Sequence, residues 1–534
     1  MKECVYQYLK KLGITELELV YTEISDFGHL SSNSAFKLAT KGGSPLGLAN
    51  KFVEMIREKD RGVFFKDVQA VGLGFINFWL SDAALIEELK NLLKAKEKYG
   101  QGFLPRAERK KIQVEFISAN PTGPLTMANG RGGFLGDALS NVLEWAGNKV
   151  EREYYVNDTG NQIIVLGKSI LASLGLVSDE ATFYKGDYIK KWATGHIAIA
   201  KKLAKNPNKN ALQLGQLAAK DFLSAIKLML EKKAKIHFDR FTSEERNIHK
   251  KSYIKNTLKI FKKTGTTYEK DGAVWLKTTD YGDDKDRVII TRDRFPTYFL
   301  ADAGHYLETK ERKFDKKVNI IGPDHYGYVS RIQAATELMG LKDSQVIVTQ
   351  AVRVVKNGIE MKMSKRRGVF ITFEEVVDEV GADAARFFFL MHTPNSHMDF
   401  DLVLAKERSI KNPVYYVQYA YVRTLGILQK TKSLEKKSGQ ANFRLLHTEA
   451  DHNLMLELLK FTDMVKSTAE DFEVSRLTRY AMNLAQLFHN FYEKERIAGE
   501  KEEIALARRE LMVATRIILN RSLKLLGVST PKKM

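Results

Sequence analysis

The spacing of apolar residues divides the chain into stretches of different character. From about residue 405 onward, apolar positions recur with a helical period in four long segments, residues 412–431, 451–472, 475–497 and 502–527. Earlier in the chain, short β-rich runs alternate with helical patterns. These runs are residues 111–118, 150–158, 315–322 and 344–355, and a helix is expected after each of the first three. The alternation predicts a parallel sheet with crossover helices, and the long helical segments predict an all-α domain.

Two stretches depart from this alternation. Residues 63–81 are β-rich and partly alternating, and residues 82–102 form an amphipathic helical pattern that ends in glycine. Between about 160 and 270 the pattern is mostly helical, and hairpin-like strands follow at 272–291. We therefore predict an α/β multidomain protein with three parts. They are a small α+β domain at residues 1–108, a Rossmann-like parallel-sheet domain at 109–404 with a helical insertion at about 160–270, and an all-α domain at 405–534.

The composition is typical of a soluble globular protein. The chain has 534 residues, of which 44% are hydrophobic and 28% charged, so it is too long for one ordinary core. Its apolar runs are too short to span a bilayer, and charged residues interrupt those near the N-terminus, so we expect neither a membrane segment nor a secretory signal. Cys4 is the only cysteine, which excludes an intrachain disulfide and a cysteine-rich metal site. These features favour the cytoplasm.

An excess of basic residues is the first indication of a partner. The formal net charge is +20 and the isoelectric point is about 9.5. Residues 190–270 alone contain twenty Lys or Arg against six Asp or Glu. This surplus favours a polyanion such as nucleic acid, although solvated lysine-rich helices would have the same composition.

The stretch 113–147 reads as an apolar strand, a turn and an amphipathic helix. Pro121, Gly123 and Pro124 shape the turn, and Asn129 is a candidate helix cap. A glycine-rich segment at 130–133 would allow close approach to a ligand. A helix that starts beyond the end of a parallel strand offers free N–H groups to phosphate. The alternative is that this segment is only a tight turn between a strand and a helix and binds no ligand.

A second motif is a dense basic segment. Lys362, Lys365, Arg366 and Arg367 place four cations within six residues on an apparent loop. Such density is unfavourable unless the charges are solvated or face phosphate, so the segment is either an exposed basic turn or a phosphate-binding loop.

The two motifs together resemble class I aminoacyl-tRNA synthetases, in which Lys-Met-Ser-Lys, here residues 362–365, is one signature. More closely, several segments resemble arginyl-tRNA synthetases, in that family's order across residues 111–420. They are "SANPTGPL" (118–125), "REYYVNDTGNQI" (152–163), "TTDYGDDKDRVII" (278–290), "PTYFLADAGHYL" (296–307), "IGPDHYGY" (321–328), "DFDLVLA" (399–405) and "NPVYYVQYA" (412–420). The resemblance implies a catalytic parallel-sheet domain, an all-α anticodon-binding domain and an N-terminal domain that contacts the tRNA elbow.

The resemblance also implies an activity and its partners. The expected reaction activates L-arginine with ATP and transfers it to the terminal ribose of tRNA(Arg). ATP is then a co-substrate accompanied by Mg²⁺, and neither a tightly bound cofactor nor a protein-held metal is expected. We expect a monomer with no membrane association. Catalysis would depend on positioning and on stabilising the transferring phosphates.

The same resemblance assigns roles to individual residues. The expected catalytic residues are Lys362, Lys365, Thr126 and Asn129. The expected ATP-binding residues are Thr126, Ala128, Asn129, Gly130, Gly322, Asp324, His325, Met363, Ser364 and Lys365. The expected arginine-binding residues are Glu115, Ser118, Asn120, Glu244, Tyr298 and Asp302. On residue type alone Tyr298 and Asp302 would read as a surface pair, and Tyr415, Tyr416 and Tyr419, the candidate tRNA-binding residues, would read as core.

One segment departs from the family pattern. The second class I signature, His-x-Gly-His, is here Thr126-Met127-Ala128-Asn129, so both histidines are absent. Thr126 and Asn129 retain hydrogen-bonding capacity, which favours an active enzyme. Two alternatives stay open: a catalytically silent tRNA-binding relative, and a class I ligase for another amino acid.

Overall fold

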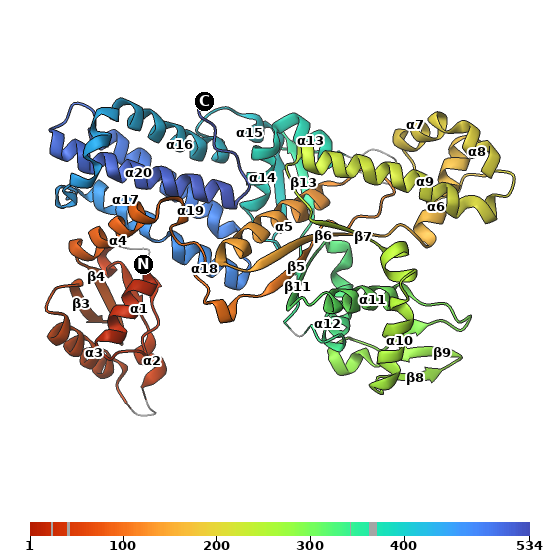
Figure 1. The fold of residues 1–534 in the computed structure, drawn as a ribbon, viewed down its shortest axis with the longest axis horizontal. Coiled ribbons are helices and arrows are strands. Elements are labelled where there is room, and N and C mark those ends of the chain that lie inside the picture. The colour runs from red at the N-terminus through yellow and green to blue at the C-terminus, as the bar shows by residue number, and fades with distance from the viewer. Residues whose placement is uncertain (23–24, 40–42, 342, 362–370) are drawn as a thin grey trace.

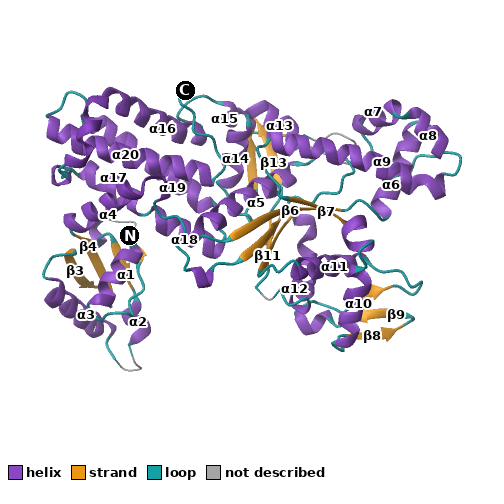
Figure 2. Cartoon of the chain, viewed as in Figure 1, coloured by secondary structure: helices purple, strands orange, loops and turns teal. Residues whose placement is uncertain are grey.

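The computed structural model describes residues 1–22, 25–39, 43–341, 343–361 and 371–534. Figures 1 and 2 show a central parallel sheet with a helical bundle on one side and two further lobes on the other. The N-terminal domain lies beneath the bundle, at the opposite end of the long axis from helices α7 (Asp187–Gly195) and α8 (Ile197–Leu203). No helix in the described part of the chain is both long and apolar enough to cross a membrane.

The N-terminal domain is a four-stranded antiparallel sheet covered by helices. Its strand order is β1 (Val20–Tyr21), β2 (Leu30–Ser32), β4 (Phe75–Leu80), β3 (Phe65–Val71), with helices α1 (Lys2–Lys11), α2 (Ser34–Leu38) and α3 (Pro45–Asp60). The start of α3 follows from its sequence, since Pro45 is at the first helical position and Ser44 Oγ accepts a hydrogen bond from Gly47 N. The predicted strands within residues 63–81 are confirmed as the β3–β4 hairpin.

The next helix belongs spatially to the other end of the chain. Helix α4 (Asp82–Ala95) packs against α17 (Glu449–Leu459) and α20 (Glu502–Leu525) of the C-terminal bundle. Just beyond it, the Glu97 carboxylate accepts hydrogen bonds from Arg516 and Asn520, both on α20. The chain after the β3–β4 hairpin is therefore anchored to the bundle before it enters the central sheet.

The predicted parallel sheet is confirmed. Its order is β12 (Gln345–Val348), β11 (Lys316–Ile321), β5 (Lys111–Glu115), β6 (Lys149–Val156), β7 (Arg240–Ser243), and each neighbouring pair is parallel. The chain runs from β5 outward through β6 to β7, and then returns to β11 on the other side of β5. The strand order therefore reverses between β5 and β11, which is where open α/β sheets bind their ligands. Helix α5 (Met127–Ala146) follows β5, α6 (Asn161–Ser173) follows β6, and α12 (Val329–Leu338) follows β11.

Two expectations about this sheet were wrong. Residues 344–355 are two strands, because β13 (Val352–Lys356) leaves the main sheet and forms a separate one with β14 (Ile359–Glu360) and β15 (Met398–Asp401). The stretch 160–270 is interrupted by β7, so the helices before β7 form the β6–β7 crossover. Strand β7 has only four residues within a mostly helical stretch, so its alternation is lost in a sequence window long enough to detect a helix.

The β6–β7 crossover forms its own helical lobe. Helices α6 and α9 (Pro207–Leu228) pack so closely that a Cβ at Gly167 would lie 1.9 Å from Ala211 O. A second lobe contains α10 (Tyr253–Lys263), the antiparallel sheet of β8 (Thr267–Lys270), β9 (Ala273–Leu276) and β10 (Arg287–Ile290), α11 (Tyr298–Glu311) and α12. The predicted hairpin-like strands at 272–291 correspond to β9 and β10.

The C-terminal region is helical, as predicted. After α13 (Phe373–Val380), α14 (Ala382–Leu390) and α15 (Leu402–Lys406), the bundle comprises α16 (Pro413–Lys430), α17, α18 (Phe461–Asp471), α19 (Ser475–Lys494) and α20. The single helix expected at 451–472 is divided into α17 and α18, with the break at Lys460. The bundle core is continuous with that of the central sheet through buried residues of α5 and α14.

Candidate active site

The carboxyl ends of four parallel strands bring the candidate residues together. Strand β5 ends at Glu115, which pairs with Asn319 of β11 on one side and with Glu153 of β6 on the other. Strand β7 ends at Ser243, directly before Glu244, and β11 ends directly before Gly322. Because carboxyl ends of parallel strands share one edge, Glu115, Glu244 and Gly322, which are among the predicted site residues, lie along the same edge of the sheet.

The segment that replaces the missing histidines forms the start of α5. Thr126 is the N-cap, which corrects the expectation that Asn129 would cap the helix. The Thr126 backbone N–H and hydroxyl both donate to Asn129 Oδ1, at 2.9 Å each. Asn129 therefore stabilises the helix start through its oxygen, and its Nδ2 amide is the group left to donate to a ligand. Histidine would also be a donor at this position.

Packing explains one glycine of this segment. A Cβ at Gly130 would lie 2.4 Å from the Phe373 ring, so only glycine fits there. At Gly132, two positions on, the nearest atom to a Cβ would be Ile320 Cγ2 at 3.7 Å, an ordinary contact. Gly130 is buried and Ala128 is half-buried. Contact of Gly130 with ATP stays a prediction, and it would have to go through the backbone.

The chain that follows the basic motif lies against the helix start. Phe373 N donates to Leu125 O at 2.9 Å, and Thr372 forms an isolated antiparallel bridge with Thr126. Thr372 also caps α13 in a reciprocal arrangement with Glu375. Lys362, Met363, Ser364 and Lys365 lie outside the described residues. The chain that follows the Lys-Met-Ser-Lys segment in the sequence thus lies beside residues 126–129, which correspond to the His-x-Gly-His signature.

The predicted adenosine-side residues are on an exposed turn beyond β11. Gly322 is the N-cap of a 3₁₀ turn at Pro323–Tyr328, and Asp324 and His325 are exposed on it. No atom of the described residues would lie within 4 Å of a Cβ at Gly322. The His325 ring is edge-on to Tyr328, with centroids 6.2 Å apart. These side chains are accessible to a ligand and contribute little to the core.

The predicted arginine-side residues form an acidic cluster. Burial raises the pKa of Asp302 well above its usual value, and the Glu244 and Glu115 carboxylates raise it further. Burial together with Glu244, Asp302 and Glu115 also raises the pKa of Tyr155, whose hydroxyl is buried with no hydrogen-bond partner among the described residues. Asp302 is thus a buried carboxylate that lies near two further carboxylates, and a cationic ligand would favour its ionised form.

Each carboxylate of the cluster is held by its own element. Ser118 Oγ donates to Glu115 Oε1 at 3.0 Å and accepts from Tyr155 N at 3.0 Å. Glu244 lies on a π-helical turn, Glu244–His249, and its Oε1 is 3.0 Å from His249 Nε2. Asp158 fixes that turn, because it accepts hydrogen bonds from Ser243 Oγ and Glu245 N.

Tyr298 and Asn120 meet at the start of α6. Tyr298, at 53% exposure, accepts a hydrogen bond from Asn161 N at 3.1 Å through its hydroxyl. Asn120 Nδ2 donates to Gln162 Oε1. Tyr298 and Asp302 occupy the first and second turns of α11, as the four-residue spacing predicted. The structure therefore brings all six predicted arginine-binding residues to one region, with Gln162 as an additional polar group.

Several residues of this region were missed by sequence reasoning. Tyr155 and Glu153 are within the segment that carried the family resemblance, yet nothing in their spacing marks them as site residues. Lys317 and His305 are buried beneath Glu115 and Glu153. Buried charged residues on strands and helices have no sequence signal that separates them from surface ones.

The candidate tRNA-binding tyrosines lie on one half-buried face of the bundle. Tyr415 and Tyr419 of α16 are parallel, with ring centroids 6.2 Å apart, and Tyr416 packs on His489 of α19 at 4.7 Å. The Arg423 guanidinium is 4.8 Å from the Tyr419 ring centroid. The residues are therefore neither fully core nor isolated on the surface, and their contact with RNA stays a prediction.

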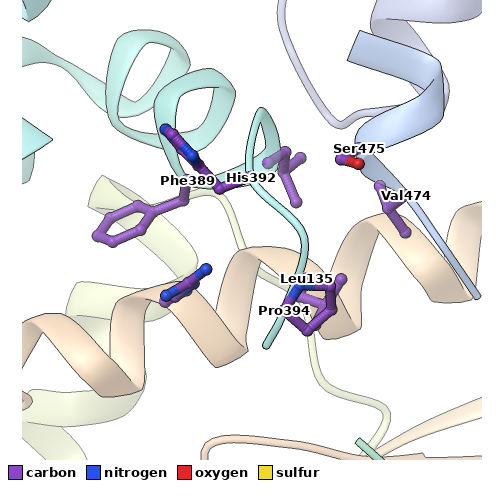
Figure 3. Close-up of a pocket in the computed structure, with 8 residues that line it drawn as sticks. Leu135, Phe389, His392, Pro394, Val474 and Ser475 are labelled. Atoms are coloured by element: carbon purple, nitrogen blue, oxygen red, sulfur yellow. The ribbon is translucent and has the colours of Figure 1, made fainter. Parts of the chain in front are cut away.

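A small pocket lies away from the acidic cluster, at the junction of α5 with the C-terminal bundle. Figure 3 shows Leu135 of α5, Phe389 and His392 at the end of α14, and Val474 and Ser475 at the start of α19 around it. Arg131, which also lines it, is buried and donates to the Gln350 and Thr393 carbonyls at 2.9 and 2.8 Å. The lining is mostly apolar, and Arg131 and Ser475 are hydrogen-bonded within the protein, so the pocket is a packing gap between regions.

The strand order, the helix start at its reversal and the flanking domains are those of a class I aminoacyl-tRNA synthetase. The family model described as "tRNA synthetases class I (R), catalytic domain" matches residues 88–396. The models "Arginyl tRNA synthetase N terminal domain" and "DALR anticodon binding domain" match residues 1–80 and 417–534. The chain belongs to the arginyl-tRNA synthetase family.

Individual relatives agree with this assignment. An "Arginine--tRNA ligase" from Heliobacterium modesticaldum is 40% identical over 524 residues, covering 95% of this chain and 92% of that protein. Another, from Carboxydothermus hydrogenoformans, is 38% identical over 520 residues with the same coverage. Among solved structures, a putative arginyl-tRNA synthetase from Campylobacter jejuni is 32% identical with a TM-score of 0.76, covering 85% of this chain and all of that chain. Arginyl-tRNA synthetase from Thermus thermophilus has a TM-score of 0.80 at 21% identity, covering 100% and 99%, and shows the shared fold.

Proposed function

We propose that this chain is an arginine–tRNA ligase, which forms arginyl-adenylate from L-arginine and ATP and transfers the arginyl group to the 3′-terminal ribose of tRNA(Arg). The observation that carries the proposal is the cluster of Glu115, Glu244 and Asp302 at the reversal of strand order, beside the start of α5. A cation-seeking pocket next to a phosphate-binding helix start suits a cationic amino acid and a nucleotide at the same time. Full-length relatives named as arginine–tRNA ligases support it.

The first step requires no covalent enzyme intermediate. A carboxylate oxygen of arginine attacks the α-phosphorus of ATP, a new P–O bond forms, and the bond to pyrophosphate breaks. The backbone N–H groups at the start of α5 and Asn129 Nδ2 would face the phosphates. Lys362 and Lys365 would stabilise the negative charge that moves to pyrophosphate. Mg²⁺ would accompany the ATP phosphates as part of the substrate.

In the second step a hydroxyl of the terminal ribose attacks the carbonyl carbon of the adenylate. The C–O bond to the ribose forms, and AMP leaves with its phosphate. The chain's contribution is again the placement of reacting groups, since no side chain has to act as a nucleophile.

The acidic cluster divides the recognition of arginine between two ends. Asp302 and Glu244 would accept hydrogen bonds from the guanidinium, with Tyr298 at the open side of the pocket. Ser118 and Asn120 would hold the amino end, supported by Glu115, which accepts from Ser118 Oγ. Gln162 would fix Asn120 through the hydrogen bond between their side chains.

The bundle would read the anticodon, with Tyr415, Tyr416 and Tyr419 available to stack on unpaired bases. The half-buried stack and the adjacent Arg423 support this role. We further propose that the protein acts as a monomer in the cytoplasm.

Arginine-dependent exchange of pyrophosphate into ATP, measured with tRNA(Arg) present, tests the proposal. We expect exchange with arginine and none with lysine or citrulline. Tight tRNA binding without exchange would instead support a silent tRNA-binding relative, the candidate that the absent histidines favour. Exchange with a different amino acid alone would contradict the assignment of the acidic cluster to arginine.

A variant of the basic segment tests catalysis separately. Lys365→Ala should reduce the rate of pyrophosphate exchange and leave tRNA affinity nearly unchanged, because the lysine would act on phosphates and not on RNA. Equal loss of exchange and of tRNA binding would contradict that role.

A further inference from the structure

Lys317 is a fully buried lysine beneath the acidic cluster, and the steps described above do not use it. It lies on β11, directly opposite Gln113 of β5. Its ammonium has three oxygen neighbours: Gln113 Oε1 at 2.6 Å, Glu115 Oε2 at 2.8 Å and Glu153 Oε2 at 3.4 Å. Three N–H donors thus have three acceptors, which is the condition under which a charge is tolerated in the interior.

Neighbouring carboxylates stabilise the positive charge of Lys317. Burial alone would lower the pKa of Lys317, but the Glu115 and Glu153 carboxylates raise it above its usual value. Although burial opposes its ionisation, the pKa of Glu153 is held far below its usual range by His305 and Lys317. Both directions favour an ion pair between the Lys317 ammonium and the Glu153 carboxylate.

Glu115 connects this buried network to the acidic cluster. One of its oxygens, Oε2, receives Lys317, and the other, Oε1, receives Ser118. Glu115 also contributes to the raised pKa values of Asp302 and Tyr155, so it lies near both. Glu153, in contrast, has no exposed side-chain surface and contacts His305 Nε2 at 3.0 Å.

Glu115, Glu153 and His305 place one potential ligand atom each within 4.8 Å of one another. Such a trio would suit a metal ion, but the Lys317 ammonium lies 2.8 and 3.4 Å from its two carboxylates. A cation that the chain itself supplies already occupies the centre of the group. The arrangement therefore fixes the two carboxylates without any external ion.

We propose that Lys317 is a positioning residue for arginine recognition, which holds the Glu115 carboxylate in place for the substrate's α-ammonium. The inference rests on the proposed function, in which Glu115 supports the amino end of arginine. Without the lysine, two carboxylates within 4.8 Å of each other would compete, and one of them would take up a proton. Glu153 keeps His305 Nε2 at 3.0 Å and two guanidiniums, those of Arg240 and Arg312, at 3.6 and 3.7 Å. Among the described basic residues, Glu115 keeps only His305, whose Nδ1 is at 3.8 Å, so Glu115 is the carboxylate expected to become neutral in the variant.

The test compares substrate affinities of the full-length protein by isothermal titration calorimetry. Lys317→Met keeps an unbranched side chain, one heavy atom shorter, and removes the charge. We expect the dissociation constant of L-arginine to rise about tenfold, with ATP affinity unchanged. The affinity of 5-guanidinopentanoic acid, which has the guanidinium and the carboxylate but no α-ammonium, should change less than twofold.

Two further variants separate positioning from stability. Arg508→Met removes another buried cation, which lies near Asp451 and Glu495 in the bundle, so it should lower the melting temperature without altering arginine affinity. Glu153→Gln combined with Lys317→Met removes the competing carboxylate, so Glu115 should ionise again and arginine affinity should return to within about threefold of the wild type.

An unchanged arginine affinity in Lys317→Met, in a wild-type background that binds arginine, would overturn this inference and leave the proposed function intact. An equal loss for 5-guanidinopentanoic acid would overturn it as well, because the effect would then not act through the α-ammonium. Failure of the double variant to recover affinity despite a wild-type melting temperature would also contradict it. Absence of arginine binding by the wild type would count against the proposed function itself.

Discussion

The two halves of the candidate active site are built in different ways. On the arginine side, Glu115, Glu244 and Asp302 come from three separate elements, and their surroundings are fixed by buried hydrogen bonds and ion pairs. On the ATP side, a helix start and an exposed turn provide backbone groups and accessible side chains. Recognition of one particular side chain needs charges in fixed places, whereas phosphates can be bound by backbone N–H groups that any sequence supplies.

This contrast predicts that the ATP side depends little on the two signature histidines that the chain lacks. Thr126 and Asn129 maintain the helix start by bonding to each other, and the N–H groups of α5 do not depend on residue type. A comparable replacement in the acidic cluster would leave buried charges without partners. Substitutions on the two sides should therefore differ in both size and kind of effect.

The largest effect is expected on the arginine side. Asp302→Asn removes an ionic partner of the guanidinium and should weaken arginine binding by about 30-fold or more, with ATP affinity nearly unchanged. Asp324→Asn, on the exposed turn beyond β11, is the matched change on the ATP side and should leave arginine affinity unaltered. Calorimetric titration of each ligand into both variants measures the difference. A similar loss of ATP binding in Asp302→Asn would show that the pocket is misplaced.

The next effect concerns stability on the ATP side. Gly130→Ala would place a Cβ 2.4 Å from the Phe373 ring and should reduce the free energy of unfolding by about 1–3 kcal/mol. Gly132→Ala, on the same helix, meets nothing closer than 3.7 Å and should be neutral or stabilising. Urea unfolding of both variants provides the comparison. Equal stability of the two would mean that Phe373 moves aside at little cost.

A smaller effect is expected when the family's histidines are restored. Thr126→His with Asn129→His removes the mutual bonding at the start of α5 and should lower the free energy of unfolding by about 1 kcal/mol. Pyrophosphate exchange should not rise if, as proposed, the backbone N–H groups and the Asn129 amide bind the phosphates. A rise of tenfold or more would instead show that the present segment limits catalysis.

The smallest effect is a dependence of arginine binding on pH. Asp302 has a raised pKa in the free protein, so it favours the protonated form, and the guanidinium needs the ionised form. Arginine should therefore release a proton on binding, and its affinity should increase as pH rises through the raised pKa of Asp302. The stability that protonated Asp302 contributes to the free protein is lost over the same rise in pH. Because arginine binds more tightly at the higher pH, the increase in melting temperature that arginine causes should become larger. Titration in two buffers of different ionisation enthalpy measures the released proton, and Asp302→Asn should abolish the release.

The sequence alone predicted the main elements of the fold and several residues of the candidate site, but it missed one strand and two breaks. Periodicity was sufficient for the parallel sheet and the all-α region, and family motifs brought Glu115, Tyr298 and Asp302 into one expected pocket. Strand β7 escaped prediction because four residues between helices have no period of their own. The break at Lys460 and the change of sheet after β12 depend on contacts between distant segments, which local sequence does not contain.

The buried support of the site was hidden for a different reason. Lys317 and Glu153 look like ordinary surface charges in the sequence, and only the register of β5, β6 and β11 shows that they face each other inside the fold. The same holds for Asn129, whose role as an acceptor for Thr126 follows from the helix start and not from its residue type. The roles of Lys362 and Lys365 stay predictions, since both lie outside the described residues.

The pairing of Gln113 with Lys317 limits which substitutions the protein could accept at these two positions during evolution. Both side chains are fully buried on adjacent strands, and Lys317 donates to Gln113 Oε1 at 2.6 Å. An aliphatic residue at position 113 would remove one of three acceptors from Lys317, and an aliphatic residue at position 317 would leave Glu115 and Glu153 without their shared cation. Both positions should therefore stay polar in relatives that keep Glu115 and Glu153.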